Sequence, residues 1–158
     1  KCLIFDDAGR ILLVEVANRG TLDLPGGHGR KGETPIEAMK REVSEEIGLE
    51  VSEIIKLGPI NSEKVQYIFV ALNFAGDFEL QLSEISNYYW ADFSELLIDV
   101  QGQPQKFEDV VILVMTQYTD QIREISSIEN KIEYYKSHPR YNPEDYMARP
   151  MVENLEKV

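Results

Sequence analysis

Cysteine and long apolar runs are nearly absent from this chain of 158 residues. Cys2 is the only cysteine, so no disulfide can form within the chain, and we expect a reducing compartment, the cytoplasm. No stretch approaches the roughly 18 consecutive apolar residues of a membrane-spanning helix, and the first residues lack the layout of a signal peptide. We therefore expect no association with a membrane.

Basic residues are also scarce, because 16 Lys and Arg stand against 28 Asp and Glu and give a formal net charge of −12. Such a chain repels other polyanions, so we expect no binding to nucleic acid polymers. A small phosphate ester that is held through a metal ion remains compatible with this charge. We therefore expect a small molecule as partner.

The stretch from Gly27 to Leu49, GHGRKGETPIEAMKREVSEEIGL, joins a glycine-rich loop to a helix. Glycines in the loop PGGHGRKGE allow positive φ and a close approach of the backbone to a ligand. Thr34 is a suitable N-cap, with Pro35 in the first helical position and Glu37 completing a capping box, and Gly48 is a suitable C-cap. One apolar stripe, which we expect to face a core, recurs at helical spacing: Ile36, Met39, Val43 and Ile47.

Three carboxylates lie on an adjoining arc of this helix, since Glu42, Glu45 and Glu46 are spaced i, i+3 and i+4. Like charges at this spacing each cost about 0.2–0.5 kcal/mol in an isolated helix, and Arg41 is the neighbouring cation. A bound divalent cation would remove the repulsion, and oxygen-only ligands suit Mg²⁺ or Mn²⁺. The alternative is a solvated acidic face, because Glu is a common surface residue of helices.

The spacing of the whole stretch resembles the signature of the Nudix hydrolases at every specified position. It runs Gly27, five residues, Glu33, seven residues, and then Arg-Glu-Val-x-Glu-Glu-x-Gly-Leu from Arg41 to Leu49. So many fixed positions make a chance match far less probable than for a short glycine motif. The chain is identified on this basis as a member of the Nudix superfamily.

The resemblance implies an α/β protein with the Nudix fold, a mixed β-sheet in an α/β/α sandwich. It also implies a pyrophosphohydrolase that depends on a divalent metal, Mg²⁺ or Mn²⁺, and cleaves a small-molecule nucleotide, a nucleoside diphosphate linked to another moiety. The metal ligands that it implies are the carboxylates of Glu42, Glu45 and Glu46 and the backbone carbonyl of Gly26 or Gly27.

The same resemblance implies roles for the neighbouring residues. Arg41 would orient one of the carboxylates by a charge-assisted hydrogen bond, and Glu33 would fix the loop to the helix. Gly27 and Gly48 would be structural. The general base varies in the family, and here it is Glu42 or Glu84, the latter in an acidic loop before Trp90.

Three residues are candidates for binding the substrate. Arg19 could reach a phosphate from the loop before residue 22, and Arg30 from the glycine-rich loop. Tyr67 lies 18 residues past Leu49, a spacing that resembles members acting on diadenosine polyphosphates. The alternatives are solvated arginines and a core tyrosine. Substrate classes left open are dinucleoside polyphosphates, nucleotide sugars including ADP-ribose, and modified nucleoside triphosphates.

The remaining elements follow from β-rich runs and turn residues. Residues 2–5 and 11–16 are predicted to form a hairpin, and since residues 2–5 resemble the middle of a strand we expect a few residues to precede Lys1. Residues 51–57 are predicted to be a strand that ends in a turn at Gly58 and Pro59. Residues 65–74, VQYIFVALNF, are predicted to be a buried central strand.

The C-terminal third is predicted to differ from residues 1–106, the Nudix core. Residues 107–136 carry a helical apolar pattern and are predicted to form one long helix, the first half of which covers the sheet. The second half is spaced closer to a heptad, which favours a partner helix or a homodimer; folding back on the same domain is the alternative. Residues 137–158 are predicted to be a tail.

Two other function classes need to be weighed against the enzyme. One is a Nudix fold kept as a binding or regulatory module without catalysis, and the complete set of Arg41, Glu42, Glu45 and Glu46 argues against it. The other is a helical interaction protein organised by residues 107–136, which leaves the signature unexplained. The sequence therefore favours a pyrophosphohydrolase.

Overall fold

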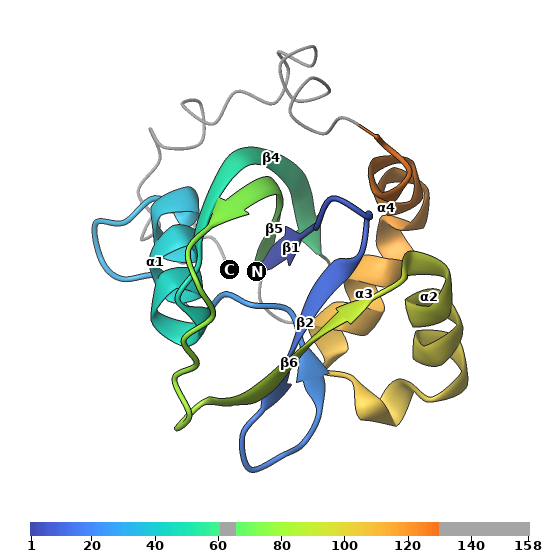
Figure 1. Cartoon of the computed structure of the whole chain (residues 1–158), viewed down its shortest axis with the longest axis horizontal. Coiled ribbons are helices and arrows are strands. Elements are labelled where there is room, and N and C mark those ends of the chain that lie inside the picture. Colours follow the sequence, from blue (N-terminus) through green and yellow to red (C-terminus); the bar gives the residue numbers. More distant parts are fainter. Residues whose placement is uncertain (61–65, 130–158) are drawn as a thin grey trace.

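The computed structural model describes residues 1–60 and 66–129, and two small sheets lie at its centre (Figure 1). In the first sheet, β5 (Gln66–Ala75) lies between β1 (Cys2–Ile4), which is parallel to it, and β4 (Glu50–Ile60), which is antiparallel. In the second, β2 (Ile11–Val16) lies between β3 (Leu22–Asp23) and β6 (Ile85–Ala91), both antiparallel to it. The predicted buried central strand is thus confirmed as β5.

Helices cover the sheets from two sides (Figure 1). On one side is α1 (Pro35–Ile47); on the other are α2 (Phe93–Gly102), a short 3₁₀ turn η1 (Pro104–Lys106), α3 (Asp109–Gln117) and α4 (Thr119–Ser126). Two apolar cores result, one under α1 and one under α2 to α4. The α/β/α sandwich with a mixed sheet is confirmed.

Helix α1 has the ends and the buried face that the sequence predicts. The Thr34 hydroxyl accepts a hydrogen bond from the Glu37 amide (3.2 Å), and Gly48 closes the helix at φ 79° with its amide bonded to the Ser44 carbonyl. All four members of the apolar stripe are at most 2% exposed: Ile36, Met39, Val43 and Ile47. Burial of this stripe fixes the orientation of α1, so that Glu42 and Glu45 lie on its outer side while Glu46 stays buried.

The predicted hairpin of residues 2–5 and 11–16 is wrong. An isolated bridge joins Phe5 to Ile11, and Asp6 holds the turn by accepting the amides of Ala8 (3.0 Å) and Arg10 (2.8 Å), but β1 and β2 belong to different sheets. All of β1 and the first four residues of β2 are buried. Strands that are apolar on both faces gain more from an interior place with other partners than from an open hairpin.

Strand β4 also differs from the prediction, because it runs on through Gly58 and Pro59 to Ile60. A bulge between Lys56 and Gly58 absorbs the irregular residues. Gly58 has φ 144°, and the Tyr118 hydroxyl donates to the Pro59 carbonyl there. Gly58 and Pro59 thus mark an irregular point in the backbone, as their types indicate, but this point is a bulge within the strand and not a turn that ends it.

The single helix predicted from Phe107 is wrong over its described part, where α3 and α4 meet at Tyr118 (φ −120°) and the helix ends at Ser126. Thr116 donates to the Ile112 carbonyl (2.6 Å) and Thr119 to the Met115 carbonyl, and such bonds bend helices. Both helices do pack on the core, as expected of the first half. The heptad-like half begins at residue 120, and its described part packs on the same domain, since Ile122 and Ile125 are buried in this core. The rest of that half, the homodimer and the tail concern residues 130–158, outside the described residues.

Within the described segments, none of the helices has the length and apolarity needed to traverse a bilayer.

The environment of Cys2 predicts an unreactive thiol. Its side chain is fully buried in β1, and burial raises the pKa of Cys2 to about 12, so the reactive thiolate is rare at pH 8. We expect no reaction with a thiol-specific disulfide reagent in the native protein and complete reaction in denaturant. A variant with an exposed thiol in α2, Ser94→Cys, should react at once; rapid labelling of native Cys2 would contradict the described packing.

Candidate active site

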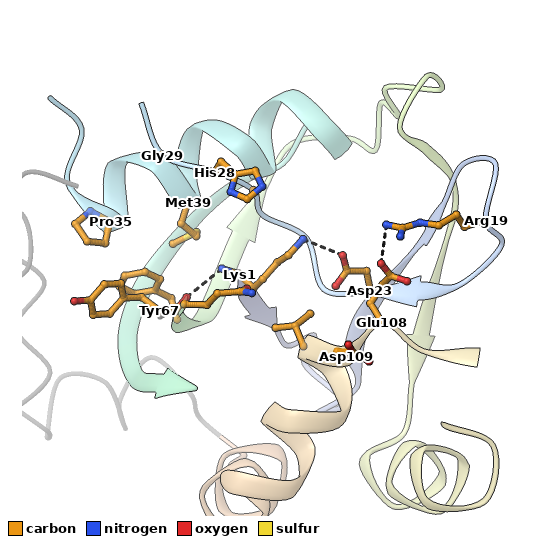
Figure 2. Close-up of a pocket in the computed structure, with 14 residues that line it drawn as sticks. Lys1, Arg19, Asp23, His28, Gly29, Pro35, Met39, Tyr67, Glu108 and Asp109 are labelled. Carbon is orange, nitrogen blue, oxygen red and sulfur yellow. Dashed lines mark hydrogen bonds and ion pairs between the residues drawn. The ribbon is translucent and has the colours of Figure 1, made fainter. Parts of the chain in front are cut away.

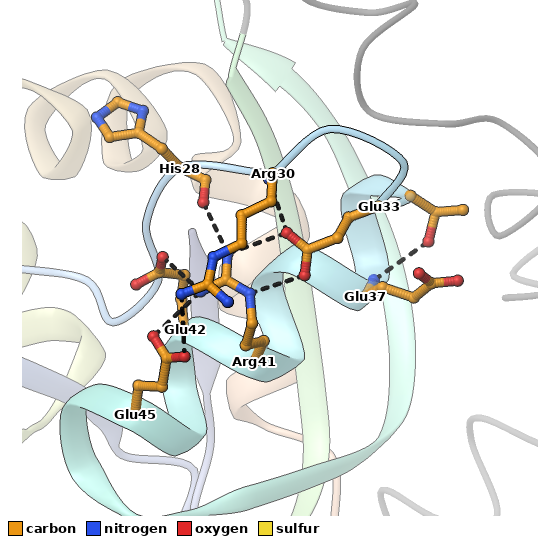
Figure 3. Close-up of polar contacts among 8 residues, drawn as sticks. His28, Arg30, Glu33, Glu37, Arg41, Glu42 and Glu45 are labelled. Carbon is orange, nitrogen blue, oxygen red and sulfur yellow. Dashed lines mark hydrogen bonds and ion pairs between the residues drawn. The ribbon is translucent and has the colours of Figure 1, made fainter.

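The guanidinium of Arg41 joins the glycine-rich loop to α1 (Figure 3). It binds both oxygens of Glu33, through Nε (2.7 Å) and Nη2 (3.0 Å), and Nη2 also donates to the backbone carbonyl of His28 (3.0 Å). Nη1 donates to Glu42 (2.9 Å) and Glu45 (3.1 Å). One side chain therefore fixes the loop and orients two of the predicted metal ligands.

Glu33 also closes the loop on itself. Its carboxylate accepts the Arg30 amide (2.7 Å), and its own amide donates to the Arg30 carbonyl (3.0 Å). The hydrogen bonds from Arg41, more than the amide, hold the pKa of Glu33 below its ordinary value, whereas the partial burial of the carboxylate acts in the opposite direction. The role predicted for Glu33, fixing the loop to the helix, agrees with these contacts.

Gly27 lets the loop backbone pass close to Glu42. A Cβ at Gly27 would lie 2.7 Å from Glu42 Oε2, closer than two such atoms can approach. A side chain at this position would therefore push the Glu42 carboxylate out of its place. The loop and the carboxylate together form a cradle that any other residue would partly fill.

Glu46 is the buried member of the acidic set, with 5% exposure. Burial raises the pKa of Glu46 to about 7; the ammonium of Lys1 opposes this shift, and the negative charges of Glu42, Asp23 and Glu84 add to it. These carboxylates are therefore close enough to sense one another. Glu45, by contrast, is half-exposed and faces Arg41 and Arg30.

The donor set fits a hard divalent cation. Within residues 1–60 and 66–129, the carboxylates are not gathered tightly enough to hold a metal ion as they stand, since arginines compensate Glu42 and Glu45. The cradle at Gly27 and the crowded carboxylates around Glu46 nevertheless offer oxygen atoms alone, as Mg²⁺ and Mn²⁺ prefer. A cation would also offset the burial, and the smaller repulsion between carboxylates, that raise the pKa of Glu46.

A pocket of about 410 Å³ opens beside this cradle (Figure 2). The glycine-rich loop and α1 form one wall, β5 the second, and the start of α3 the third. Its lining contains Met39, Tyr67, Phe69 and Val110 together with charged side chains. Its size and its mixture of apolar walls with a few polar groups are typical of small-molecule sites.

Only two of the three predicted substrate-binding residues line the pocket. Tyr67 and Arg19 line the pocket, where Arg19 is paired with Glu108 (2.7 Å). Arg30 does not line it and lies 3.5 Å from Glu45 instead. Glu84 lies in the exposed turn before β6, where its carbonyl accepts the Ala17 amide (2.8 Å).

Four charged residues of the pocket were not predicted as site residues: Lys1, Asp23, Glu108 and Asp109. No local motif marks them. Glu108 and Asp109 begin α3, where acids commonly complement the helix dipole, and Lys1 reaches the pocket only because β1 pairs with β5. Their place depends on tertiary structure.

Comparisons with known proteins agree with this arrangement. A family model described as the NUDIX domain matches residues 1–111. A search of curated proteins returned no match.

Similar solved structures include a MutT NUDIX hydrolase from Burkholderia pseudomallei, with 21% identity, a TM-score of 0.62, and 73% of this chain and 94% of that chain covered. The MutT protein from Methanosarcina mazei Go1 has 21% identity, a TM-score of 0.60 and coverage of 80% and 92%. A NUDIX hydrolase from Nitrosomonas europaea has 23% identity, a TM-score of 0.60 and coverage of 76% and 86%. At these identities the likeness shows the fold.

Replacing Glu33 by Gln tests the contribution of the hydrogen bonds between Arg41 and Glu33 to stability. The pKa of Glu33 in the folded protein is below its ordinary value of 4.5. The charge of Glu33 therefore stabilises the folded state above pH 4.5, and this stabilisation is lost as pH falls through the pKa of the folded state. We expect Glu33→Gln to lower the free energy of unfolding at pH 7 by about 1–3 kcal/mol, and by much less at pH 3.

Urea unfolding at both pH values measures this difference. Glu124→Gln, in an exposed part of α4, is the matched control and should change little at either pH. A Glu33→Gln effect of equal size at pH 7 and pH 3 would show that the charge of Glu33 contributes nothing.

Proposed function

Because the chain belongs to the NUDIX domain family, we propose that it is a divalent-metal-dependent pyrophosphohydrolase that cleaves a nucleoside diphosphate linked to another moiety. The observation that carries this proposal is the joint placement of the Arg41 network and the buried Glu46 beside a pocket of about 410 Å³. A catalytically silent module would need the pocket but not the fixed carboxylates.

The reaction requires charge compensation and a base. Water attacks one phosphorus, the bridging P–O bond breaks, and the departing phosphate keeps the bonding electrons. The proton of the attacking water passes to a carboxylate, for which Glu42 and Glu84 are the candidates. Arg41 holds Glu42 by its Oε1, which leaves Oε2 on the side of Gly27.

Glu42, Glu45 and Glu46, with the backbone carbonyl of Gly26, are the ligands we propose for Mg²⁺ or Mn²⁺. When bound, the ion supplies positive charge to the phosphate oxygens and makes a bound water more acidic. Arg41 restrains Glu42 and Glu45 before the ion arrives, so less side-chain freedom is lost on binding.

The pocket supports a nucleotide as the small-molecule substrate. Its apolar side chains, Met39, Phe69 and Val110, can contact a base or a ribose, while the glycine-rich loop faces the phosphates. Dinucleoside polyphosphates, nucleotide sugars including ADP-ribose, and modified nucleoside triphosphates all contain the required bond.

Turnover of these three substrate classes tests the proposal. Phosphate release is measured after treatment with a phosphatase, with Mg²⁺ or Mn²⁺ and with a chelator. We expect turnover of one class that the chelator abolishes and that Glu46→Gln lowers at least about 100-fold, because the variant keeps the shape of the side chain but loses its charge.

The control for Glu46→Gln is Glu50→Gln, at the exposed start of β4, which should retain wild-type turnover. No turnover of any class by the wild type would favour the binding or regulatory module instead.

Gly27→Ala tests the cradle separately. Its Cβ would lie 2.7 Å from Glu42 Oε2 and would displace that carboxylate, so we expect kcat to fall about 10-fold or more while the protein stays folded. The matched control is Gly102→Ala, because a Cβ at Gly102 has no atom within 4 Å. Equal activity of the two variants would contradict the role of the close approach.

A further inference from the structure

Lys1 is anchored against the glycine-rich loop by its backbone. Its carbonyl accepts the Phe69 amide (3.0 Å), which extends the pairing of β1 with β5. The next residue, Cys2, donates its amide to the Pro25 carbonyl (2.8 Å). A Cβ at Gly26 would lie only 2.9 Å from Lys1 Cα, so the loop and Lys1 are in direct contact.

The side chain of Lys1 crosses the pocket and is held at its tip (Figure 2). Nζ donates to Asp23 Oδ2 (2.9 Å) and to the Gly26 carbonyl (2.7 Å). An ammonium has three N–H donors, so these two contacts fix its position and leave one donor. A long side chain that is already restrained loses little rotamer freedom when it binds a ligand.

The other cations near the site are less suited to meet a phosphate in the pocket. Arg41 uses its donors on Glu33, Glu42, Glu45 and the His28 carbonyl. Arg19 lines the pocket but is paired with Glu108, and its side chain is 64% exposed.

The charges on the pocket wall favour a role for such a cation. Lys1 and Arg19 are its basic side chains, and Asp23, Glu108 and Asp109 its acidic ones, so the wall repels a pyrophosphate on balance. The Lys1 ammonium, held by Asp23 and the Gly26 carbonyl, lies beside the glycine-rich loop in this pocket.

We propose that Lys1 binds the substrate: its remaining N–H donates to a phosphate oxygen of the pyrophosphate and holds that group against the glycine-rich loop. This inference rests on the proposed function. The Gly26 carbonyl has two lone pairs, so it can accept from Lys1 and still serve as a metal ligand.

Binding of imidodiphosphate, a pyrophosphate analogue with a P–N–P bridge, tests the proposal without turnover. Titration calorimetry with Mg²⁺ compares the wild type with Lys1→Met, Lys1→Gln and Lys1→Arg. We expect binding to weaken about 10- to 100-fold in Lys1→Met and Lys1→Gln, as for the loss of a charged hydrogen bond, and to stay within a few-fold in Lys1→Arg.

The control is Lys40→Met, which removes an exposed lysine of α1 that does not line the pocket and should bind as the wild type does. Lys1→Gln keeps a donor for Asp23 and the Gly26 carbonyl, so it covers the case in which Lys1→Met does not fold. Wild-type affinity in Lys1→Gln, or no binding by the wild type, overturns the proposal.

The two proposals fail separately. If imidodiphosphate binding depends on Lys1 but none of the three substrate classes is hydrolysed, the phosphate contact stands and the hydrolase does not. If hydrolysis is found while binding and KM are unchanged in Lys1→Gln, the hydrolase stands and the role of Lys1 is refuted.

Discussion

The fixed geometry of the site depends on the Arg41 guanidinium and the carboxylates around it. A flexible loop rich in glycine has no regular backbone pairing to hold it, and α1 alone would carry three mutually repelling acids. Arg41 solves both problems, because its planar fork binds Glu33 at two points and reaches Glu42 and Glu45 with its other nitrogen. The loop and the helix are thereby held as one unit.

The two cores explain why this unit has a fixed place. α1 is held by its apolar stripe on one side of the sheets, and α2 to α4 are packed on the other side. The pocket lies where the loop, β5 and the start of α3 come together. Packing thus determines the shape of the site, whereas Arg41 positions the carboxylates and the glycines let the loop approach them.

Much of this could be predicted from the sequence because it is local. The ends of α1, its buried stripe and the carboxylates all follow from spacing within one helix, and the strand at residues 65–74 follows from its β-branched and aromatic residues. The resemblance of residues 27–49 to the Nudix signature then predicts the fold of the whole domain.

The rest could not be predicted because it depends on distant partners. Residues 2–5 and 11–16 have a turn between them, but their pairing is decided by β5 and β6. Tyr118 interrupts the predicted long helix where it bonds to Pro59, in a bulge that only tertiary packing creates. Lys1 and Glu108 carry no motif, and they reach the pocket from positions far from the glycine-rich loop in the sequence.

The proposed hydrolase would direct water to a phosphorus of a pyrophosphate bond. The most direct measurement is hydrolysis of the three nucleotide classes in ¹⁸O-labelled water, with the products analysed by mass spectrometry. Attack of water at phosphorus should place one ¹⁸O atom in a phosphate group of one product of the preferred substrate. Products that carry the label on a sugar or base instead of a phosphate, or no products at all, would contradict it.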